Sequence, residues 1–249
     1  VLLESSDYHG LENSYSYIGF SPIGGISVNN FLIVEEYPNG VQVETQVVDP
    51  LTVADRFDVF LKEFEIAENE SKLNINGLFG YTSYESVQYF EDVKLSARNT
   101  VPGDMPGLHY VFFKYIIAIN HFNNELTIIE NLLEGESSAI QSIERILENN
   151  NMATYQFEAI GDEKCDISDE DFKRMVTRGK QECQKGNVFQ IVLSRRFYQQ
   201  YKGDDFMLYR TLRSVNPSPY LFYFNFGDFR IFGSSPEAHL VVDVKKQKA

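Results

Sequence analysis

The chain has 249 residues, 43% hydrophobic and 14% aromatic, so it can build the core of one large or two smaller domains. Its formal net charge of −14 argues against nucleic-acid binding, because phosphate contacts need clustered Lys and Arg. No apolar run reaches the roughly 18 residues of a membrane-spanning helix, so no membrane association is expected.

Cysteine and histidine usage predicts neither a disulfide framework nor a metal site. Cys165 and Cys183 are the two cysteines, and the four histidines are scattered without ligand spacing. The opening residues lack the basic stretch and the cleavage pattern of a signal peptide. We therefore expect a cytoplasmic protein, and we expect that both ends of the given chain are cut.

Short strands separated by turns are predicted for the first 48 residues. Pro22, Gly24-Gly25 and Pro38-Asn39-Gly40 separate them, which is typical of an antiparallel meander. The expected strands cover residues 1–5, 15–21, 26–34 and 41–48.

A helix follows the meander, and strands and helices then alternate irregularly. Asp49-Pro50 predicts a cap and a first helical position, with apolar residues at helical spacing up to about residue 66. Asn123-Asn124 predicts a hairpin turn. The further elements expected before residue 150 are a strand at 77–81, a short helix at 84–90, a hairpin of 108–119 with 126–129, and a helix at 137–147.

A polar run at residues 148–151 predicts a domain boundary, which divides the chain into 1–150 and 151–249. Ser168 and Asp171 have the spacing of a capping box before an apolar helical stripe that ends near Gly186. A strand at 186–197, a helix at 206–215 and a hairpin of 220–225 with 229–232 are expected after it. No alternation of strands and helices with glycine-rich turns occurs, so we predict an α+β fold. It would consist of antiparallel, sandwich-like sheets with helices on their outer faces.

The segment GNVFQIVLSRRF, residues 186–197, is the most informative stretch. In a strand, alternate side chains point to opposite faces, so Gln190, Ser194 and Arg196 would share one face. A polar pocket wall and a solvated strand edge both fit this face. Arg195 and Arg196 could attract an anionic ligand or form structural ion pairs, and these two roles remain equally open.

Several motifs occur in a specific order along the whole chain. They are LLES at 2–5, Tyr-Ser-x-Ile-Gly at 15–19, Gly-Tyr-x-x-Tyr-Glu at 80–85, Asp-Met-Pro at 104–106, GNVFQIVLSRRF at 186–197, NPSPYLFYF at 216–224 and GSSPE at 233–237. In this order and spacing the sequence resembles the chorismate-utilising enzymes, in particular the anthranilate synthase component I branch. That branch converts chorismate and ammonia to anthranilate and pyruvate in tryptophan biosynthesis, and a glutamine amidotransferase subunit supplies the ammonia.

The resemblance implies that this chain carries about half of such an enzyme. The Mg2+-binding glutamates, the catalytic histidine and the contacts to the chorismate carboxylate would lie beyond residue 249. The resemblance therefore implies that the fragment alone does not turn over chorismate. One catalytic position falls inside it: Gln190 stands where the water-adding relatives have lysine, which can act as a general base. An amide cannot, so Gln190 indicates ammonia as the nucleophile.

The resemblance also implies feedback inhibition by L-tryptophan, bound between the LLES strand and the NPSPY hairpin. An acidic group and a hydroxyl suit an ammonium, and aromatic and aliphatic groups suit an indole. Leu221 replaces the usual Met, while Ser14 and Gln88 replace frequent Arg. The implied tryptophan contacts are Glu4, Ser5, Tyr15, Pro219, Tyr220 and Leu221.

Two alternatives remain. The large subunit of aminodeoxychorismate synthase shares nearly all of these motifs, although LLES together with NPSPY favours the anthranilate branch. The chain could also be a regulatory module that binds tryptophan without catalysis.

Overall fold

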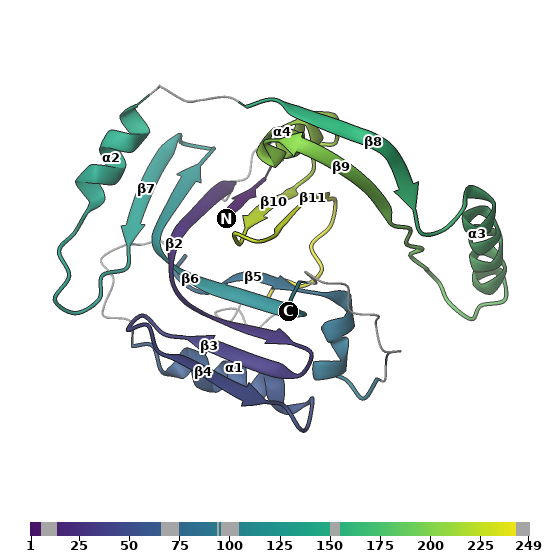
Figure 1. Ribbon diagram of the computed structural model, residues 1–249, viewed down its shortest axis with the longest axis horizontal. Coiled ribbons are helices and arrows are strands. Elements are labelled where there is room, and N and C mark those ends of the chain that lie inside the picture. Colours follow the sequence, from purple (N-terminus) through teal and green to yellow (C-terminus); the bar gives the residue numbers. More distant parts are fainter. Residues whose placement is uncertain (6–13, 66–74, 94, 96–104, 150–154, 243–249) are drawn as a thin grey trace. The chain divides into compact units, whose positions relative to one another are not determined.

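The computed structural model describes residues 1–5, 14–65, 75–93, 95, 105–149 and 155–242. The chain forms two compact units (Figure 1). Unit 1 comprises Val1–Asn150 and Leu212–Ala249, and unit 2 comprises Asn151–Thr211. The expected boundary near residue 150 coincides with the start of unit 2, but the chain returns to unit 1 at Leu212. The division into 1–150 and 151–249 stays a prediction about the domains of the whole protein.

In the described residues, unit 1 is built on one nine-stranded antiparallel sheet, which confirms the α+β class (Figure 1). Six strands follow the order β11-β10-β1-β2-β3-β4, while β6 pairs with β2 and carries β5 and β7. The strands are β1 (Leu2–Glu4), β2 (Tyr15–Asn29), β3 (Leu32–Glu36), β4 (Gln42–Gln46), β5 (Phe79–Thr82), β6 (Leu108–Asn120), β7 (Glu125–Glu130), β10 (Tyr220–Asn225) and β11 (Arg230–Ser235).

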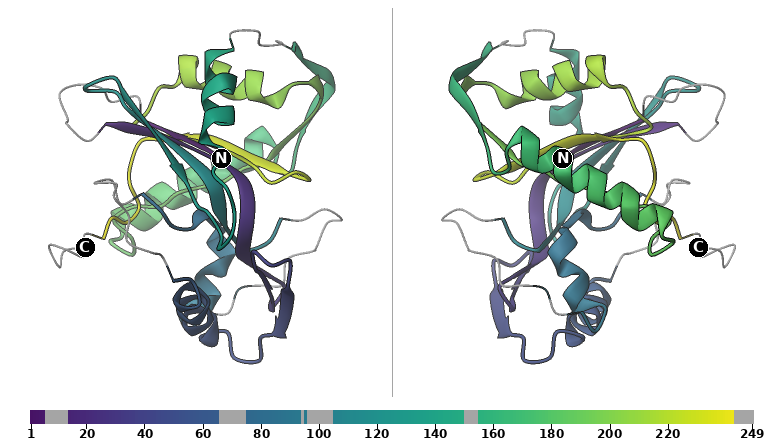
Figure 2. Two further views of the ribbon diagram at one scale, coloured as in Figure 1. Left: turned by 90° about the vertical axis from the view of Figure 1, so that its left-hand side faces the viewer. Right: turned by 90° about the vertical axis from the view of Figure 1, so that its right-hand side faces the viewer.

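The long strand β2 organises this sheet and curves through the unit beside β6 (Figure 2). The predicted break near Pro22 is wrong, since one strand runs through it. The register with β6 shifts between Pro22 and Gly24, and a β-bulge tolerates a proline that cannot donate a ladder hydrogen bond. The predicted strand over 26–34 is also wrong, because Asn30 and Phe31 have positive φ angles of 48° and 64° and turn the chain from β2 into β3.

Helix α1 (Thr52–Lys62) covers the part of the sheet that contains β3. Its Val53 and Phe60 side chains are buried with Ile26, Val28 and Ile33, and a fully buried side chain of this size contributes roughly 1.5–3 kcal/mol. The helix begins later and ends earlier than predicted. A turn precedes it, in which the Thr52 amide donates to the Asp49 carbonyl at 3.1 Å.

Two shorter helical elements also lie in the described part of unit 1. The expected short helix is a 3-10 helix, η1 (Tyr84–Tyr89), because its hydrogen bonds close tighter turns. Helix α2 (Ile140–Glu148) packs Ile143 against Ile117 and Tyr115 of β6. The hairpin of β6 with β7 is confirmed, with Asn124 in a positive-φ conformation at its turn.

Unit 2 contains a two-stranded antiparallel sheet and helices. Its elements are β8 (Phe157–Cys165), α3 (Asp169–Gln184), β9 (Phe197–Gly203) and the first part of α4 (Asp205–Val215). The predicted cap is confirmed, since Ser168 Oγ accepts a hydrogen bond from the Asp171 amide at 3.2 Å. The sequence did not predict β8.

The expected strand at 186–197 is wrong over most of its length. Residues 188–196 form an irregular segment, and β9 begins only at Phe197. A strand needs a hydrogen-bonded neighbour, and β8 and β9 pair only with each other within the described part of the chain. The predicted alternation survives in part, because Ile191 and Leu193 both lie against Gly179 of α3.

Candidate functional site

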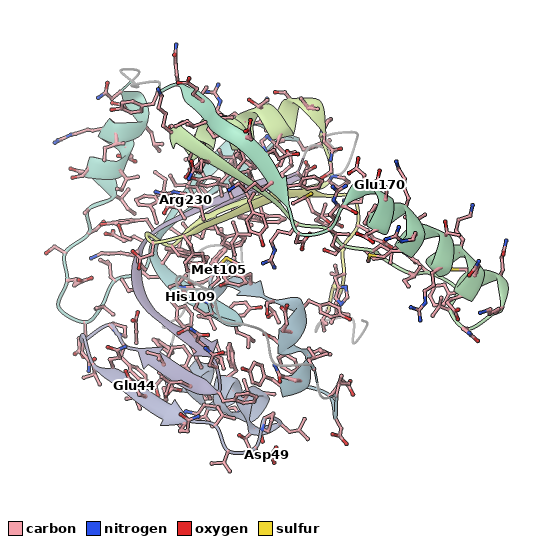
Figure 3. The ribbon with its side chains drawn as sticks, turned by 45° about the vertical axis from the view of Figure 1, so that its right-hand side comes forward. Glu44, Asp49, Met105, His109, Glu170 and Arg230 are labelled. Atoms are coloured by element: carbon pink, nitrogen blue, oxygen red, sulfur yellow. The ribbon has the colours of Figure 1, made fainter. Side chains whose placement is uncertain are left out.

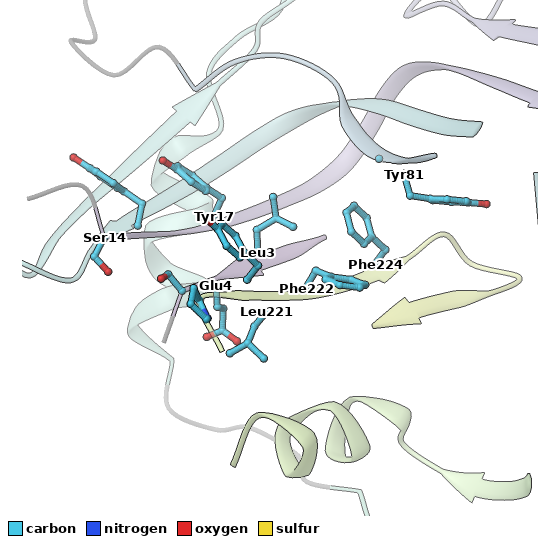
Figure 4. Close-up of a pocket in the computed structure, with 13 residues that line it drawn as sticks. Leu3, Glu4, Ser14, Tyr17, Tyr81, Leu221, Phe222 and Phe224 are labelled. Atoms are coloured by element: carbon cyan, nitrogen blue, oxygen red, sulfur yellow. The ribbon is translucent and has the colours of Figure 1, made fainter. Parts of the chain in front are cut away.

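Unit 1 contains a pocket of about 780 Å³ where β1, β2, β5 and β10 meet (Figure 4). All six predicted tryptophan contacts line it. Glu4 comes from β1 and Ser5 from the residue after it, while Tyr15 comes from the start of β2. Pro219, Tyr220 and Leu221 come from the start of β10 and the turn before it. Two motifs more than 200 residues apart in sequence are thus neighbours in space, since β1 pairs directly with β10.

Strand register explains the aromatic wall of this pocket. Leu3 lies opposite Phe222 on β10 and opposite Tyr17 on β2, so these three side chains share one face of the sheet. Tyr15 stacks on Tyr17 with ring centroids 5.8 Å apart. Side chains two positions apart on a strand share a face, so Tyr220, Phe222 and Phe224 of β10 lie on the same face. Phe222 and Phe224 thereby extend the aromatic surface that lines the pocket (Figure 4).

The motif Gly80-Tyr81 on β5 forms a further part of the lining. Gly80 lies so close to β6 that an added Cβ would stand 2.0 Å from the His109 carbonyl oxygen. The Tyr81 hydroxyl donates to the Pro106 carbonyl at 2.8 Å, and its ring lies 5.8 Å from the Phe226 ring. Burial raises the pKa of Tyr81 far above its usual range, so this phenol stays neutral at physiological pH.

Tyr17 is a second neutral phenol in the pocket. Burial raises its pKa, and the neighbouring Tyr15 raises it further. The two tyrosines therefore offer neutral hydroxyl groups and aromatic faces, and they add no charge to the pocket.

Charge enters the pocket through Glu4. Its side chain is 10% exposed, and its Oε1 atom lies 3.1 Å from Nη1 of Arg213 in the last turn of α4. Both residues belong to unit 1. Glu4, which is predicted to contact the ammonium group of tryptophan, therefore already has the guanidinium of Arg213 beside it.

The turn between α4 and β10 is held by hydrogen bonds from β11. Ser234 Oγ donates to the Asn216 carbonyl at 2.5 Å and lies 2.9 Å from Ser218 Oγ. This second strand of the hairpin fixes the proline-rich segment that carries Pro219 into the pocket.

Sequence reasoning did not assign seven residues that also line the pocket. They are Leu3, Ser14, Tyr17, Gly80, Tyr81, Phe222 and Phe224. The period-two pattern of Tyr15 with Tyr17, and of Tyr220 with Phe222 and Phe224, is a signal that could have identified several of them. Gly80 and Tyr81 were recognised as a motif, but their approach to β1 and β10 depends on the curvature of the sheet.

Gln190, the predicted catalytic residue, lies in the irregular segment of unit 2 and is exposed. The pocket of unit 1 does not include it. The neighbouring Arg195 forms an ion pair with Asp169 at 2.7 Å and lies over the Phe197 ring at 4.6 Å. These contacts correspond to the structural role considered for Arg195, whereas the catalytic role of Gln190 stays a prediction.

Among the described residues, no group of three or more His, Cys, Asp or Glu side chains could hold a metal ion. In the same part of the chain, no helix has both the length and the apolar character needed to cross a membrane.

The chain is similar to known proteins over almost its whole length. It is 30% identical to anthranilate synthase component 1 of Acetivibrio thermocellus, over 95% of this chain and 50% of that protein. It is also 30% identical to anthranilate synthase component 1 of Methanothermobacter thermautotrophicus, over 98% of this chain and 49% of that protein. The chloroplastic anthranilate synthase alpha subunit 1 of Arabidopsis thaliana is 27% identical, over 94% of this chain and 43% of that protein. The chain thus spans about half the length of the curated relatives it matches.

A solved structure shares the fold. Anthranilate synthase component I from Streptococcus pneumoniae matches with a TM-score of 0.63 and 24% identity, over 93% of this chain and 53% of that chain. The model of the family described as chorismate binding enzyme matches residues 36–248, which include most of both units. The chain therefore belongs to the chorismate binding enzyme family.

Proposed function

We propose that the chain is the N-terminal part of an anthranilate synthase large subunit. The whole enzyme would convert chorismate and ammonia to anthranilate, pyruvate and water in the cytoplasm. A glutamine amidotransferase subunit would release the ammonia from glutamine and leave glutamate. The similarity to proteins named anthranilate synthase component 1 supports this proposal.

Gln190 would determine the nucleophile in this reaction. Its amide can donate and accept hydrogen bonds but cannot remove a proton from water. Ammonia carries its own lone pair and needs only orientation, whereas water needs a base. Gln190 would thus favour amination over hydration of chorismate.

Mg2+ belongs to the proposal as the ion that would neutralise the chorismate carboxylates. The described residues contain no cluster of ligands that suits it. We assign no metal ligand to this chain. Because the chain spans about half the length of its relatives, and the resemblance places the catalytic residues beyond residue 249, we expect the chain by itself not to turn over chorismate. Incubation of the purified chain with chorismate, ammonium and Mg2+, followed by anthranilate fluorescence, tests this expectation. Appreciable anthranilate production would contradict it.

Feedback inhibition by L-tryptophan is the second part of the proposal. The observation that carries it is the meeting of all six implied contacts at one pocket. An aromatic and aliphatic wall suits an indole ring, and the polar groups of Glu4 and Ser5 suit the amino acid end. Tryptophan would bind here and stabilise the pairing of β1 with β10.

A tryptophan sensor without catalysis is the second candidate, because every lining residue of the pocket belongs to unit 1. Calorimetric titration of the purified chain with L-tryptophan tests the binding that both candidates share. Saturable binding of L-tryptophan, with no comparable binding of L-lysine, is expected. Absence of binding by the folded chain would remove the sensor candidate and the regulatory part of the main proposal. Restored anthranilate production, after fusion of this chain to the remaining half of a relative, would favour the enzyme over the sensor.

A further inference from the structure

We infer that Arg213 is a positioning residue of the pocket, which acts through Glu4 and matches the polar end to a zwitterionic ligand. This inference rests on the proposed binding of tryptophan and names a residue outside the predicted contacts. It also specifies the charge state of the ligand that the pocket accepts best.

The ion pair of Arg213 with Glu4 is partly shielded from water. The Glu4 side chain is 10% exposed and the Arg213 side chain is 46% exposed, with 3.1 Å between Nη1 and Oε1. A carboxylate this buried is costly without compensating charge, and the Arg213 guanidinium supplies that charge. Glu4 is a lining residue, and Arg213 is therefore one residue removed from the ligand.

The position of Arg213 is coupled to the pocket wall through the backbone. Helix α4 ends at Val215, and the turn at 216–219 leads directly into β10, where Tyr220 and Leu221 line the pocket. Ser234 anchors this turn through the Asn216 carbonyl. The same turn thus sets both the aromatic wall and the place of the guanidinium.

Electrostatics gives this arrangement a preference among ligands. The Glu4 and Arg213 side chains carry one negative and one positive charge, so the pair has no net charge. An amino acid zwitterion likewise carries one charge of each sign and has no net charge. A carboxylate without its guanidinium would attract a cationic amine, while a guanidinium without the carboxylate would attract an anionic acid. The Glu4 carboxylate is only 10% exposed, so water screens its charge less than that of a surface carboxylate, which strengthens this discrimination.

Calorimetry with four indole compounds tests the inference on the intact chain. L-tryptophan carries both charges, tryptamine lacks the carboxylate, indole-3-propionate lacks the ammonium, and indole lacks both. The unchanged protein is expected to bind L-tryptophan most tightly. In Arg213→Met the affinity ratio of tryptamine to tryptophan should rise about tenfold, which corresponds to about 1.4 kcal/mol. In Glu4→Gln the ratio of indole-3-propionate to tryptophan should rise instead, and Arg213→Lys should stay close to the unchanged protein.

Arg174→Met is the matched control, because Arg174 forms an exposed ion pair with Asp171 on α3. It should leave all four affinities unchanged. Near-ultraviolet circular dichroism shows whether Arg213→Met folds. If it does not, the affinity ratios are measured in Arg213→Gln and Glu4→Gln instead.

The outcomes separate this inference from the proposed function. If the unchanged chain binds tryptophan but the Arg213 variants weaken all four compounds in parallel, Arg213 has only a structural role and the inference is overturned. Unchanged ratios in these variants would overturn it equally, while tryptophan binding would stand. If the unchanged chain binds none of the four compounds, the tryptophan proposal fails and the inference fails with it.

Discussion

Gly80 on β5 and His109 on β6 lie so close together that a Cβ atom at Gly80 would stand 2.0 Å from the His109 carbonyl oxygen. Real side chains do not approach backbone oxygen at this distance, so the pairing of β5 with β6 requires glycine here. Tyr81 follows Gly80 directly and lines the pocket. The glycine therefore fixes one wall of the pocket.

Gly80→Ala should consequently lower the free energy of unfolding by roughly 1–3 kcal/mol, because the strands must separate to admit the methyl group. It should also weaken ligand binding in the pocket. Urea unfolding and calorimetry measure the two effects. Gly77→Ala is the control, since an added Cβ there meets no atom within 4 Å. Equal stability of the two variants would contradict the close approach.

Phe60 gives a prediction for the core of unit 1. It is 0% exposed and packs in a cluster with Phe112 and the partly buried Phe64. Phe60→Ala should cost about 3–5 kcal/mol, from lost burial and the cavity left behind. Val48 is 94% exposed, so Val48→Ala should change stability by less than about 0.5 kcal/mol. Similar midpoints of chemical unfolding for the two variants would show that α1 does not cover the sheet as described.

Ser168 gives a prediction for unit 2. Its Oγ accepts a hydrogen bond from the Asp171 amide at the start of α3, and loss of such a cap typically costs about 1 kcal/mol. Ser168→Ala should speed amide hydrogen exchange in the first turn of α3. Thr177→Ala, in the middle of the same helix, should leave that turn unchanged. Exchange at the first turn that is the same in Ser168→Ala and the unchanged protein would refute the capping role.

His109 predicts a pH dependence of stability. It is labelled in Figure 3, and its ring lies 4.4 Å from the Phe226 ring. Burial lowers the pKa of His109, so the unfolded chain binds its proton more readily than the folded chain. Its contribution to stability is therefore complete above its ordinary pKa of about 6.5 and is lost as the pH falls below it.

His109→Gln should reduce the loss of stability between about pH 6.5 and pH 5, as followed by urea unfolding at each pH. His239→Gln is the control, because His239 lies on the surface. A pH profile that is identical in the His109 variant and the unchanged protein would show that this histidine does not contribute.

The sequence predicted most of unit 1 because local signals and long-range pairing agree there. Apolar residues, the Asn123-Asn124 turn and the hairpin after Pro219 all indicate antiparallel strands, and the structure forms them. Pro22 misled the prediction, since a bulge allows it inside β2. Two strand segments on either side of a proline look separate in sequence when their shared partner β6 is not considered.

In unit 2, the sequence predicted local features correctly but not those that depend on pairing with a distant strand. The Ser168 cap depends on neighbours in sequence and was predicted correctly. The pattern around Gln190 is that of a strand, but β structure depends on a partner, and none pairs with residues 188–196 in the described part of the chain. The pocket of unit 1 was predicted only in part. Resemblance named six residues that all line it, and their contact with tryptophan stays a prediction, whereas the close approach of Tyr81 follows from the curved sheet.

A nuclear magnetic resonance titration of the isotopically labelled chain with L-tryptophan tests the central claim most directly. If tryptophan binds between the two motifs, the amide signals of Leu3, Glu4, Tyr220 and Leu221 should shift in a saturable manner. Those of edge strand β4, none of whose residues lines the pocket, should stay in place. Glu44 of this strand is labelled in Figure 3. Saturable shifts confined to other residues, or no shifts in the folded chain, would contradict the account.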